Sequence, residues 1–319
     1  VNLHLMMVSF YRPTAQRYRI LVEADAFPSD LYAVASQLEF HGYDPADGMV
    51  ALKPRPNEHT LRTDDILTAI EAQGEQLALV LLGGVNYYTG QFFELERICA
   101  AAHAVGAMMA TDLAHAAGNV PLRLHDWGID FACWCSYKYL NGGPGGVAGC
   151  YIHERHHQRQ DLPRFAGWWG HDKDTRFQMD PVFQPIPTAE GWQLSNAPIL
   201  AMAALRASLD IFEAVGMDRL REKSQRLTGY LADLLRARLP QADFTVITPD
   251  DPAQRGCQLS LLTGAQGRAW FDALSAQGVI CDWREPNVIR VAPTPLYNTF
   301  EEVWHCVDIL VRVEQGLTV

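Results

Sequence analysis

A lysine and an aspartate are the residues of this sequence whose types and spacing could do chemistry together. Lys138 lies in SYKYLNGGPGG (136–146), directly after an apolar stretch and before a loop rich in glycine and proline. Asp112 lies in ATDLAHAAGN (110–119), 26 residues earlier. A lysine that reaches into a cleft loses solvation, which lowers its pKa and makes the neutral amine nucleophilic. A nearby carboxylate can pair with a cationic group on a ligand.

Together these two side chains form the minimum site for pyridoxal 5′-phosphate. The lysine forms an imine with the cofactor's aldehyde, and the aspartate keeps the pyridine nitrogen protonated so that the ring accepts electrons. Glycines in the following loop let the backbone approach a ligand closely. Alone, such a lysine is usually a solvated surface charge and such an aspartate a helix N-cap. The pair and its order along the chain favour a cofactor site.

The first half of the chain must position these residues, and it alternates apolar runs with helical stretches. We expect one helix to begin at an N-cap Ser29 and to stop near Gly42. This rhythm predicts a mainly parallel sheet with helices on both faces, so that Asp112 and Lys138 follow neighbouring strands. Cys133 and Cys135 would share one face of a strand as core residues rather than metal ligands. The expected strands are 3–10, 19–23, 78–82, 107–111 and 131–136, and the expected helices are 29–40 and 95–105.

The second half predicts a smaller α+β domain. A loop region rich in Trp, Gly and Pro (168–198) precedes it. We place the division at residue 200, with a large cofactor-binding domain (1–200) and a small C-terminal domain (201–319). The expected helices are 199–215, 217–239, 266–277 and 300–315, and the expected strands are 244–247, 258–262, 279–283 and 288–292.

Composition excludes several classes of function. The 319 residues include 26 basic and 37 acidic ones, a formal net charge of −11, which argues against nucleic acid or an anionic membrane as the main partner. The longest aliphatic run, LALVLL (77–82), is far shorter than a membrane span. Seven cysteines without a CxxC pair indicate reduced thiols in a cytoplasmic protein, and no metal site is expected. Because a strand-like segment directly follows Val1, we expect a processed or truncated chain.

Several segments resemble the kynureninase family, whose members are aspartate-aminotransferase-like (fold type I) pyridoxal phosphate enzymes. Besides the two segments around Asp112 and Lys138, the resemblance covers nearly the whole chain in the expected order. The family's chains carry a further N-terminal segment before the stretch that resembles VNLHLMM. The matching segments are FPSDLYAVASQLEFHGY (27–43), VNYYTGQ (85–91), GWWGH (167–171), SNAPI (195–199) and EPNVIRVAPTPLYNTF (285–300).

The resemblance implies roles around the cofactor ring. Lys138 would hold the cofactor, Asp112 would pair with the ring nitrogen, and His115 would support the same face. Phe27 would stack on the ring, with Asp30 beside its polar edge. From the residues alone, Phe27 could instead act as a helix-start staple, Asp30 could support a helix N-terminus, and His115 could be a hydrogen-bonded helix residue.

Further roles concern the phosphate and the substrate. The resemblance implies that Tyr137 binds the phosphate, and we add it as a candidate proton donor. Trp168 and Asn196 would contribute near the phosphate or substrate, across the subunit boundary of a homodimer. Arg290 would clamp the substrate carboxylate, with an interdomain ion pair as the alternative and Arg284 as a rival. An aromatic pocket for the substrate ring could draw on Trp168, Trp169 and Phe165. Trp168 and Trp169 could instead be domain-boundary packing.

The implied reaction is hydrolysis of L-kynurenine to anthranilate and L-alanine, in tryptophan catabolism and NAD biosynthesis, with the 3-hydroxy form of kynurenine as a further candidate substrate. Two alternatives stay open. One is another enzyme of the same fold, an aminotransferase or a cysteine desulfurase, for which Cys257 is the only candidate cysteine. The other is a cofactor-free interaction protein on the same scaffold.

Overall fold

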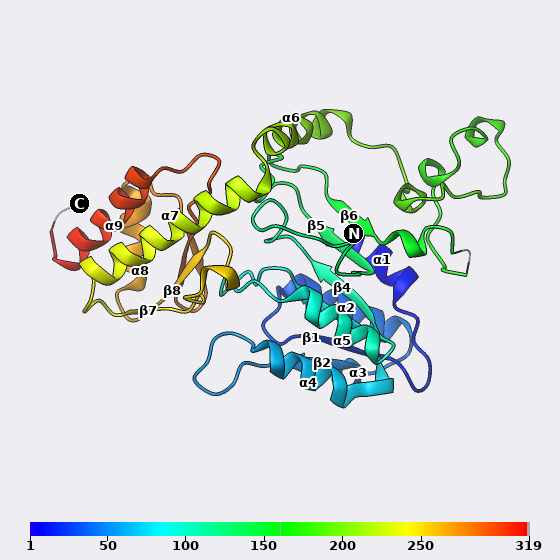
Figure 1. The fold of residues 1–319 in the computed structure, drawn as a ribbon, viewed down its shortest axis with the longest axis horizontal. Helices are drawn as coiled ribbons and strands as arrows, with labels where there is room; N and C mark the ends of the chain where they lie inside the picture. Colours follow the sequence, from blue (N-terminus) through cyan, green and yellow to red (C-terminus); the bar gives the residue numbers. More distant parts are fainter. Residues whose placement is uncertain (160, 318–319) are drawn as a thin grey trace.

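The computed structural model describes residues 1–159 and 161–317 and arranges them around two sheets (Figure 1). The larger sheet has six strands, and all of its pairings are parallel except that of β6 with β5. This architecture confirms the predicted α/β class, with a mainly parallel sheet and a smaller C-terminal α+β unit. In spatial order the strands are β2 (Met49–Leu52), β1 (Arg19–Glu23), β3 (Leu77–Gly83), β4 (Met108–Asp112), β5 (Phe131–Trp134) and β6 (Gly149–Ile152).

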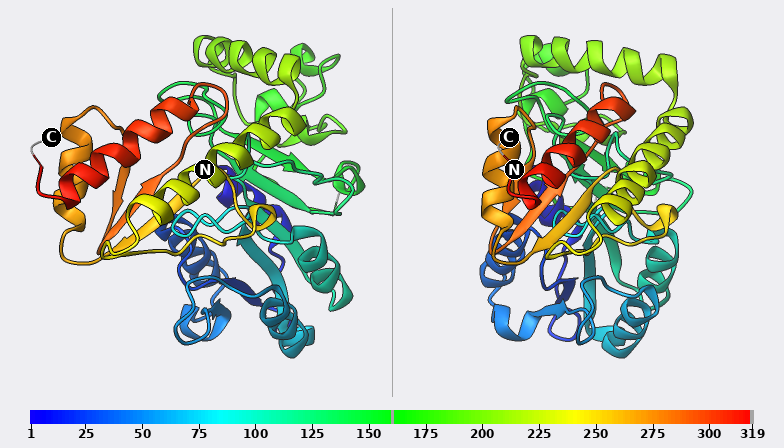
Figure 2. Two further views of the ribbon diagram at one scale, coloured as in Figure 1. Left: turned by 60° about the vertical axis from the view of Figure 1, so that its left-hand side comes forward. Right: turned by 90° about the vertical axis from the view of Figure 1, so that its left-hand side faces the viewer.

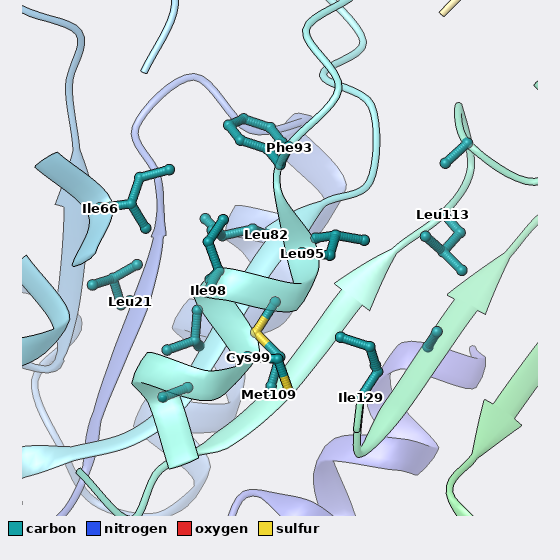
Figure 3. Packing of buried hydrophobic residues seen from close by; sticks show 14 of the residues in the cluster. Leu21, Ile66, Leu82, Phe93, Leu95, Ile98, Cys99, Met109, Leu113 and Ile129 are labelled. Carbon is teal, nitrogen blue, oxygen red and sulfur yellow. The ribbon is translucent and has the colours of Figure 1, made fainter. Parts of the chain in front are cut away.

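Helices cover both faces of this sheet, because alternate residues of its strands point to opposite sides. Leu21, Leu82 and Met109 face α4 (Thr63–Gln73) and α5 (Leu95–Ala104), and Figure 3 shows this cluster. The residues between them along the strands face the other layer, formed by α1 (Asn2–Phe10) and α2 (Pro28–Phe40), with the short α3 (Pro45–Gly48) beside α2.

The smaller sheet is antiparallel, in the order β7 (Phe244–Val246), β8 (Leu259–Thr263), β10 (Val288–Val291) and β9 (Asp282–Arg284). Its apolar face packs on three helices, α7 (Met217–Arg238), α8 (Gly267–Ala276) and α9 (Phe300–Glu314). The long α7 follows α6 (Ile199–Val215) and leads from the large sheet to the small one (Figures 1 and 2). The predicted domain division at residue 200 falls inside α6 and stays a prediction.

The structure corrects the prediction at the start of the chain. Residues 3–10 form helix α1 and no strand, so the expectation that the chain opens in a strand is wrong. A short apolar run fits a buried helix as well as a strand, and here Met6, Met7 and Phe10 are buried against the sheet. Ser29 is also not an N-cap. The helix begins one residue earlier at Pro28, whose missing N–H costs nothing in a first turn.

Other differences are smaller. The sequence does not predict β2, α3, α4 or β6, and the predicted strand 279–283 overlaps β9 only at residues 282 and 283. Cys133 is buried as expected, but β5 ends at Trp134, so Cys135 lies beyond the strand. Segment 168–198 is a loop with three short 3₁₀ turns, as predicted. Within the described residues, no His, Cys, Asp or Glu cluster could hold a metal ion, and no helix is long and apolar enough to cross a membrane.

Candidate active site

A pocket of about 270 Å³ lies at the carboxyl edge of the large sheet. Glu23 and Asp112 are the last residues of β1 and β4, and Lys138 is the fourth residue after the end of β5. Parallel strands bring their carboxyl ends to the same edge, where ligands bind in open α/β sheets. Six predicted site residues line this single pocket: Phe27, Asp30, Asp112, His115, Tyr137 and Lys138.

Asp30 and Asp112 meet as a carboxyl pair in the pocket. Their side chains share a hydrogen bond, and burial, followed by the charges of Asp112 and Glu23, raises the pKa of Asp30 to about 9, against an opposing effect of Lys138. Asp30 therefore keeps its proton at neutral pH. Asp112 also accepts the backbone N–H of Ala114 through Oδ1 at 2.7 Å. The pair can accept and donate hydrogen bonds at one end of a ligand, which a lone carboxylate cannot do.

A sharp turn after β5 points Lys138 toward the pocket. The carbonyl of Ser136 accepts the N–H of Gly142 at 2.8 Å, and a Cβ on Gly142 would stand 2.8 Å from Ser136 Oγ, so only glycine fits there. Lys138 Nζ lies 5.8 Å from the centroid of the Phe27 ring. Tyr137 lines the same pocket and is half exposed. Tyr137 and Lys138 are adjacent in sequence, and in a strand their side chains would point to opposite faces. Both reach the pocket because β5 ends at Trp134, before either residue.

His115 is a partly buried, neutral imidazole on the pocket wall. Burial, and then the positive charges of Lys138, Arg290 and Arg284, hold its pKa well below the usual value. Its Nδ1 is buried and has no hydrogen-bond partner. Its ring lies 6.5 Å from that of Tyr87, which meets the Phe27 ring edge-on at 5.3 Å. The unpaired nitrogen is thus available to a ligand.

Arg290 does not line the pocket but approaches it from the small domain. On β10 it donates to the carbonyl of Tyr87 at 2.6 Å and through Nε to Asp282 Oδ1 at 3.1 Å, and its Nη2 forms an ion pair with the same oxygen at 3.0 Å. Arg284 Nε forms an ion pair with the same Asp282 oxygen at 2.9 Å, and Arg284 Nη2 donates to Asp282 Oδ2 at 3.2 Å. Arg290 has 8% of its side chain exposed and Arg284 38%. The ion pairs of both arginines therefore lie within the small domain, and the contact that crosses to the large domain is a hydrogen bond to backbone.

Trp168 and Asn196 lie outside the pocket of this chain. Trp168 is half exposed, with its ring against Trp169 and Phe177, and Asn196 is exposed. Phe165 is also largely exposed. The structure does not bring these side chains to Lys138 within one chain, so their assignment to the site stays a prediction that requires a second subunit.

Glu23, Asn86 and Tyr87 are among the lining residues that were not predicted as site residues. Glu23 is 4% exposed and ends an apolar strand, as Asp112 does. A carboxylate in that position was the available signal, since a buried acid at a strand end points to a site.

The residues of the pocket fit pyridoxal phosphate. An amine and a carboxyl pair face a common space beside an aromatic ring, which matches an aldehyde, a basic ring nitrogen and a flat ring between them. Buried polar atoms without partners, His115 Nδ1 and Ser136 Oγ, lie on or next to the lining residues. Such orphaned groups are rare unless a ligand or water completes them.

Comparison with solved structures defines the class of fold. A cysteine desulfurase from Thermococcus onnurineus NA1 superposes with a TM-score of 0.80 at 18% identity, covering 99% of this chain and 77% of that one. The cystine C-S lyase C-DES, solved with cysteine persulfide, gives 0.79 at 19% identity over 97% and 78%. The protein therefore has the aspartate-aminotransferase-like fold of pyridoxal phosphate enzymes.

Sequence relatives narrow the class to one family. Residues 220–310 match the family model "Kynureninase C-terminal domain". A kynureninase from Myxococcus xanthus is 60% identical over 310 residues, which is 97% of this chain and 72% of that protein. A kynureninase from Koribacter versatilis is 56% identical over 308 residues, again 97% and 72%. The chain belongs to the kynureninase family, as the resemblance of its motifs indicated.

Proposed function

We propose that this chain binds pyridoxal 5′-phosphate and hydrolyses L-kynurenine to anthranilate and L-alanine. The observation that carries the proposal is the convergence of Lys138 and the Asp30–Asp112 pair on one pocket, in a member of the kynureninase family. The 3-hydroxy form of the substrate differs by one hydroxyl group and is a second candidate. The proposal places the protein in tryptophan catabolism and in the supply of NAD precursors.

The chain would hold the cofactor at several points. Lys138 Nζ would bind the aldehyde carbon, the Asp30–Asp112 pair the ring nitrogen, and Phe27 and His115 the faces of the ring. Tyr137 would donate its hydroxyl to the phosphate. When bound, the cofactor supplies a sink for electrons from the α-carbon of an amino acid.

The protein's own groups then handle protons and orientation. The amine of Lys138 is the base placed to take the α-proton, a task that needs it neutral. His115 suits this environment because it is uncharged and adds no second positive charge beside the amine. Tyr137, half exposed at the pocket mouth, is the candidate donor for the later protonation of the alanine fragment. Water supplies the oxygen of the anthranilate carboxylate.

Arg290 is proposed to bind the substrate α-carboxylate. Its fork already binds one carboxylate, that of Asp282, so a substrate would share or exchange this partner. Arg284 is the alternative residue for binding the substrate. It is more exposed than Arg290 and pairs with the same Asp282. The positive charges of both arginines lower the pKa of His115, a pocket residue, and this supports the proposed role.

We also propose a homodimer that completes the site. Helix α6 exposes Ile199 and Leu200 at 80% and 88%, and the loop before it exposes Phe177 and Met179 at about three quarters. Large exposed apolar groups are typical of a subunit interface. A second copy placed there would carry its own Trp168 and Asn196 toward the partner's pocket. We further propose a cytoplasmic location, for which the seven free cysteines are the support.

Cys257, the candidate catalytic cysteine of a cysteine desulfurase, does not have a thiol suited to nucleophilic attack. Cys257 is fully buried, and burial raises its pKa to about 12. A protonated, enclosed thiol is a poor nucleophile.

The test is a pair of spectra and a pair of assays. We expect wild-type protein loaded with pyridoxal phosphate to show a visible absorbance that borohydride removes, and Lys138→Ala to show neither this absorbance nor activity. Wild type should release anthranilate from L-kynurenine and no sulfide from L-cysteine. A bound chromophore with sulfide release would overturn the reaction, and no chromophore at all would favour the cofactor-free interaction protein.

A further inference from the structure

Glu23 is a buried acid for which the proposed reaction has no task. It lies on the wall of the pocket, and both of its carboxylate oxygens are occupied from the β3 side. Oε1 accepts the backbone N–H of Gly83 at 2.7 Å, and Oε2 accepts Asn86 Nδ2 at 2.5 Å. Burial, opposed by these two bonds and helped by Asp112 and Asp25, raises its pKa. Burying an acid costs free energy, so a buried acid at this position indicates a structural or functional role.

Asn86 carries the effect of Glu23 into the turn formed by residues 85–91. Its Oδ1 accepts the N–H of Tyr88 at 2.9 Å, the N–H of Thr89 at 2.8 Å and the Thr89 hydroxyl at 3.1 Å. Backbone N–H groups only donate, so this oxygen must face the turn and the amide nitrogen must face Glu23. The carboxylate therefore fixes the orientation of the amide, and the amide fixes the turn.

The 85–91 turn is the surface on which the small domain rests. Three successive backbone carbonyls accept hydrogen bonds from it: Tyr87 from Arg290 at 2.6 Å, Tyr88 from Ser260 Oγ at 2.6 Å, and Thr89 from Thr248 Oγ1 at 2.5 Å. The Tyr87 ring also lines the cofactor pocket. A shift of this turn would thus move Arg290 relative to the pocket.

We propose that Glu23 is a positioning residue that, through Asn86 and the 85–91 turn, sets where Arg290 stands and so sets the affinity for an amino acid carboxylate. The inference rests on the proposed function, because it assigns Arg290 to that carboxylate. It concerns binding, and it predicts a small effect on the proton transfers at Lys138.

Glu23→Gln is the first variant. Glutamine has the same size as glutamate and keeps an oxygen that accepts the N–H of Gly83. Its NH₂ group faces the NH₂ group of Asn86, so the hydrogen bond between positions 23 and 86 is lost. In the cofactor-loaded enzyme, we expect the Kd for L-alanine, followed by its change in visible absorbance, to rise roughly tenfold, as for one lost charge-assisted hydrogen bond. The KM for L-kynurenine should rise in parallel, with kcat changed less than about twofold.

A double variant separates positioning from general damage. In Glu23→Gln combined with Asn86→Asp, the new glutamine donates to one oxygen of the new aspartate, whose other oxygen still serves Tyr88 and Thr89. The charge and the hydrogen bonds are preserved with their direction reversed. We expect the Kd to return to within about threefold of wild type. Asn86→Asp alone places a new carboxylate against that of Glu23. The repulsion should weaken L-alanine binding at least as much as Glu23→Gln does.

The control is Asp130→Asn, which changes a buried acid at the opposite edge of the sheet and should leave the Kd for L-alanine unchanged. The proposal is overturned if Glu23→Gln lowers thermal stability without changing this Kd, or if the double variant binds no better than the single one. A wild type that binds L-alanine but releases no anthranilate refutes the reaction and still leaves the Kd comparison to decide the role of Glu23. A loaded wild type that binds no L-alanine overturns both.

Discussion

The two edges of the large sheet treat buried carboxyl groups in opposite ways. At the amino edge, Asp130 directly precedes β5 and is 1% exposed. It accepts His156 Nε2 and the N–H of Met109 at 2.7 Å, His103 Nε2 at 2.9 Å, and the Arg155 guanidinium. These hydrogen bonds outweigh burial and hold its pKa well below the usual range.

At the carboxyl edge, acids face one another instead. Asp30 forms a hydrogen bond with Asp112, and the charges of Asp112 and Glu23 add to burial in raising the pKa of Asp30. An acid surrounded by donors stabilises the fold, whereas acids crowded together cost stability unless a ligand provides the missing positive charge. The contrast separates a structural carboxylate from functional ones without reference to any relative, since perturbed acids of the second kind concentrate at sites.

The largest expected effect is on activity at the carboxyl edge. Asp112→Asn removes the charge that would hold the ring nitrogen, and we expect kcat for L-kynurenine to fall roughly 10²- to 10³-fold, as when one preorganised electrostatic contact is lost. The cofactor-free protein should lose no stability, because a repulsion is relieved. The measurements are anthranilate release and urea unfolding. A variant that is strongly destabilised but active would show that Asp112 is a structural carboxylate like Asp130, and would contradict the comparison.

Next in size is the stability of the amino edge. Asp130→Asn leaves two imidazoles and a guanidinium without their carboxylate, and we expect the free energy of unfolding to fall by about 3 kcal/mol. The folded enzyme should keep its kcat. Because the pKa of Asp130 is depressed, its stabilisation is present above about pH 4, the usual range of the unfolded group, and is lost as the pH falls further. Urea midpoints at pH 7 and pH 3.5 test this, and an equal loss at both would contradict it.

The smallest effect, taken over one pH unit, is on the slope with which stability changes with pH. Asp30 has a raised pKa of about 9, so between about pH 4 and pH 9 the folded state keeps a proton that the unfolded chain has released. Its contribution to stability therefore falls across this window, by at most about 1.4 kcal/mol per pH unit, and is constant above it. Asp30→Asn in the cofactor-free protein should flatten the slope and gain stability at pH 8 relative to wild type. Unfolding measured from pH 5 to pH 9 would show this, with Asp130→Asn as the control that keeps the wild-type slope.

Sequence reasoning predicted the parts of the site that depend on strand order. Asp112 and Lys138 share a pocket because Asp112 ends β4 and Lys138 follows β5, which pairs with β4 in parallel, and the apolar runs of both strands are visible in the sequence. It could not predict that Asp30 bonds Asp112 or that Asp282 holds Arg290, because side chains distant in sequence meet only in the folded chain. It mistook α1 for a strand since a buried run carries no clear period. The roles of Trp168 and Asn196 depend on a second subunit and remain predictions.

The three carbonyls that receive the small domain belong to the main chain, and this has an evolutionary consequence. A backbone oxygen is the same in every amino acid, so position 88 can drift in identity without loosening the joint between domains. The donors opposite, Thr248, Ser260 and Arg290, have no such freedom. We therefore anticipate that natural variants of this joint tolerate exchange on one side and resist it on the other.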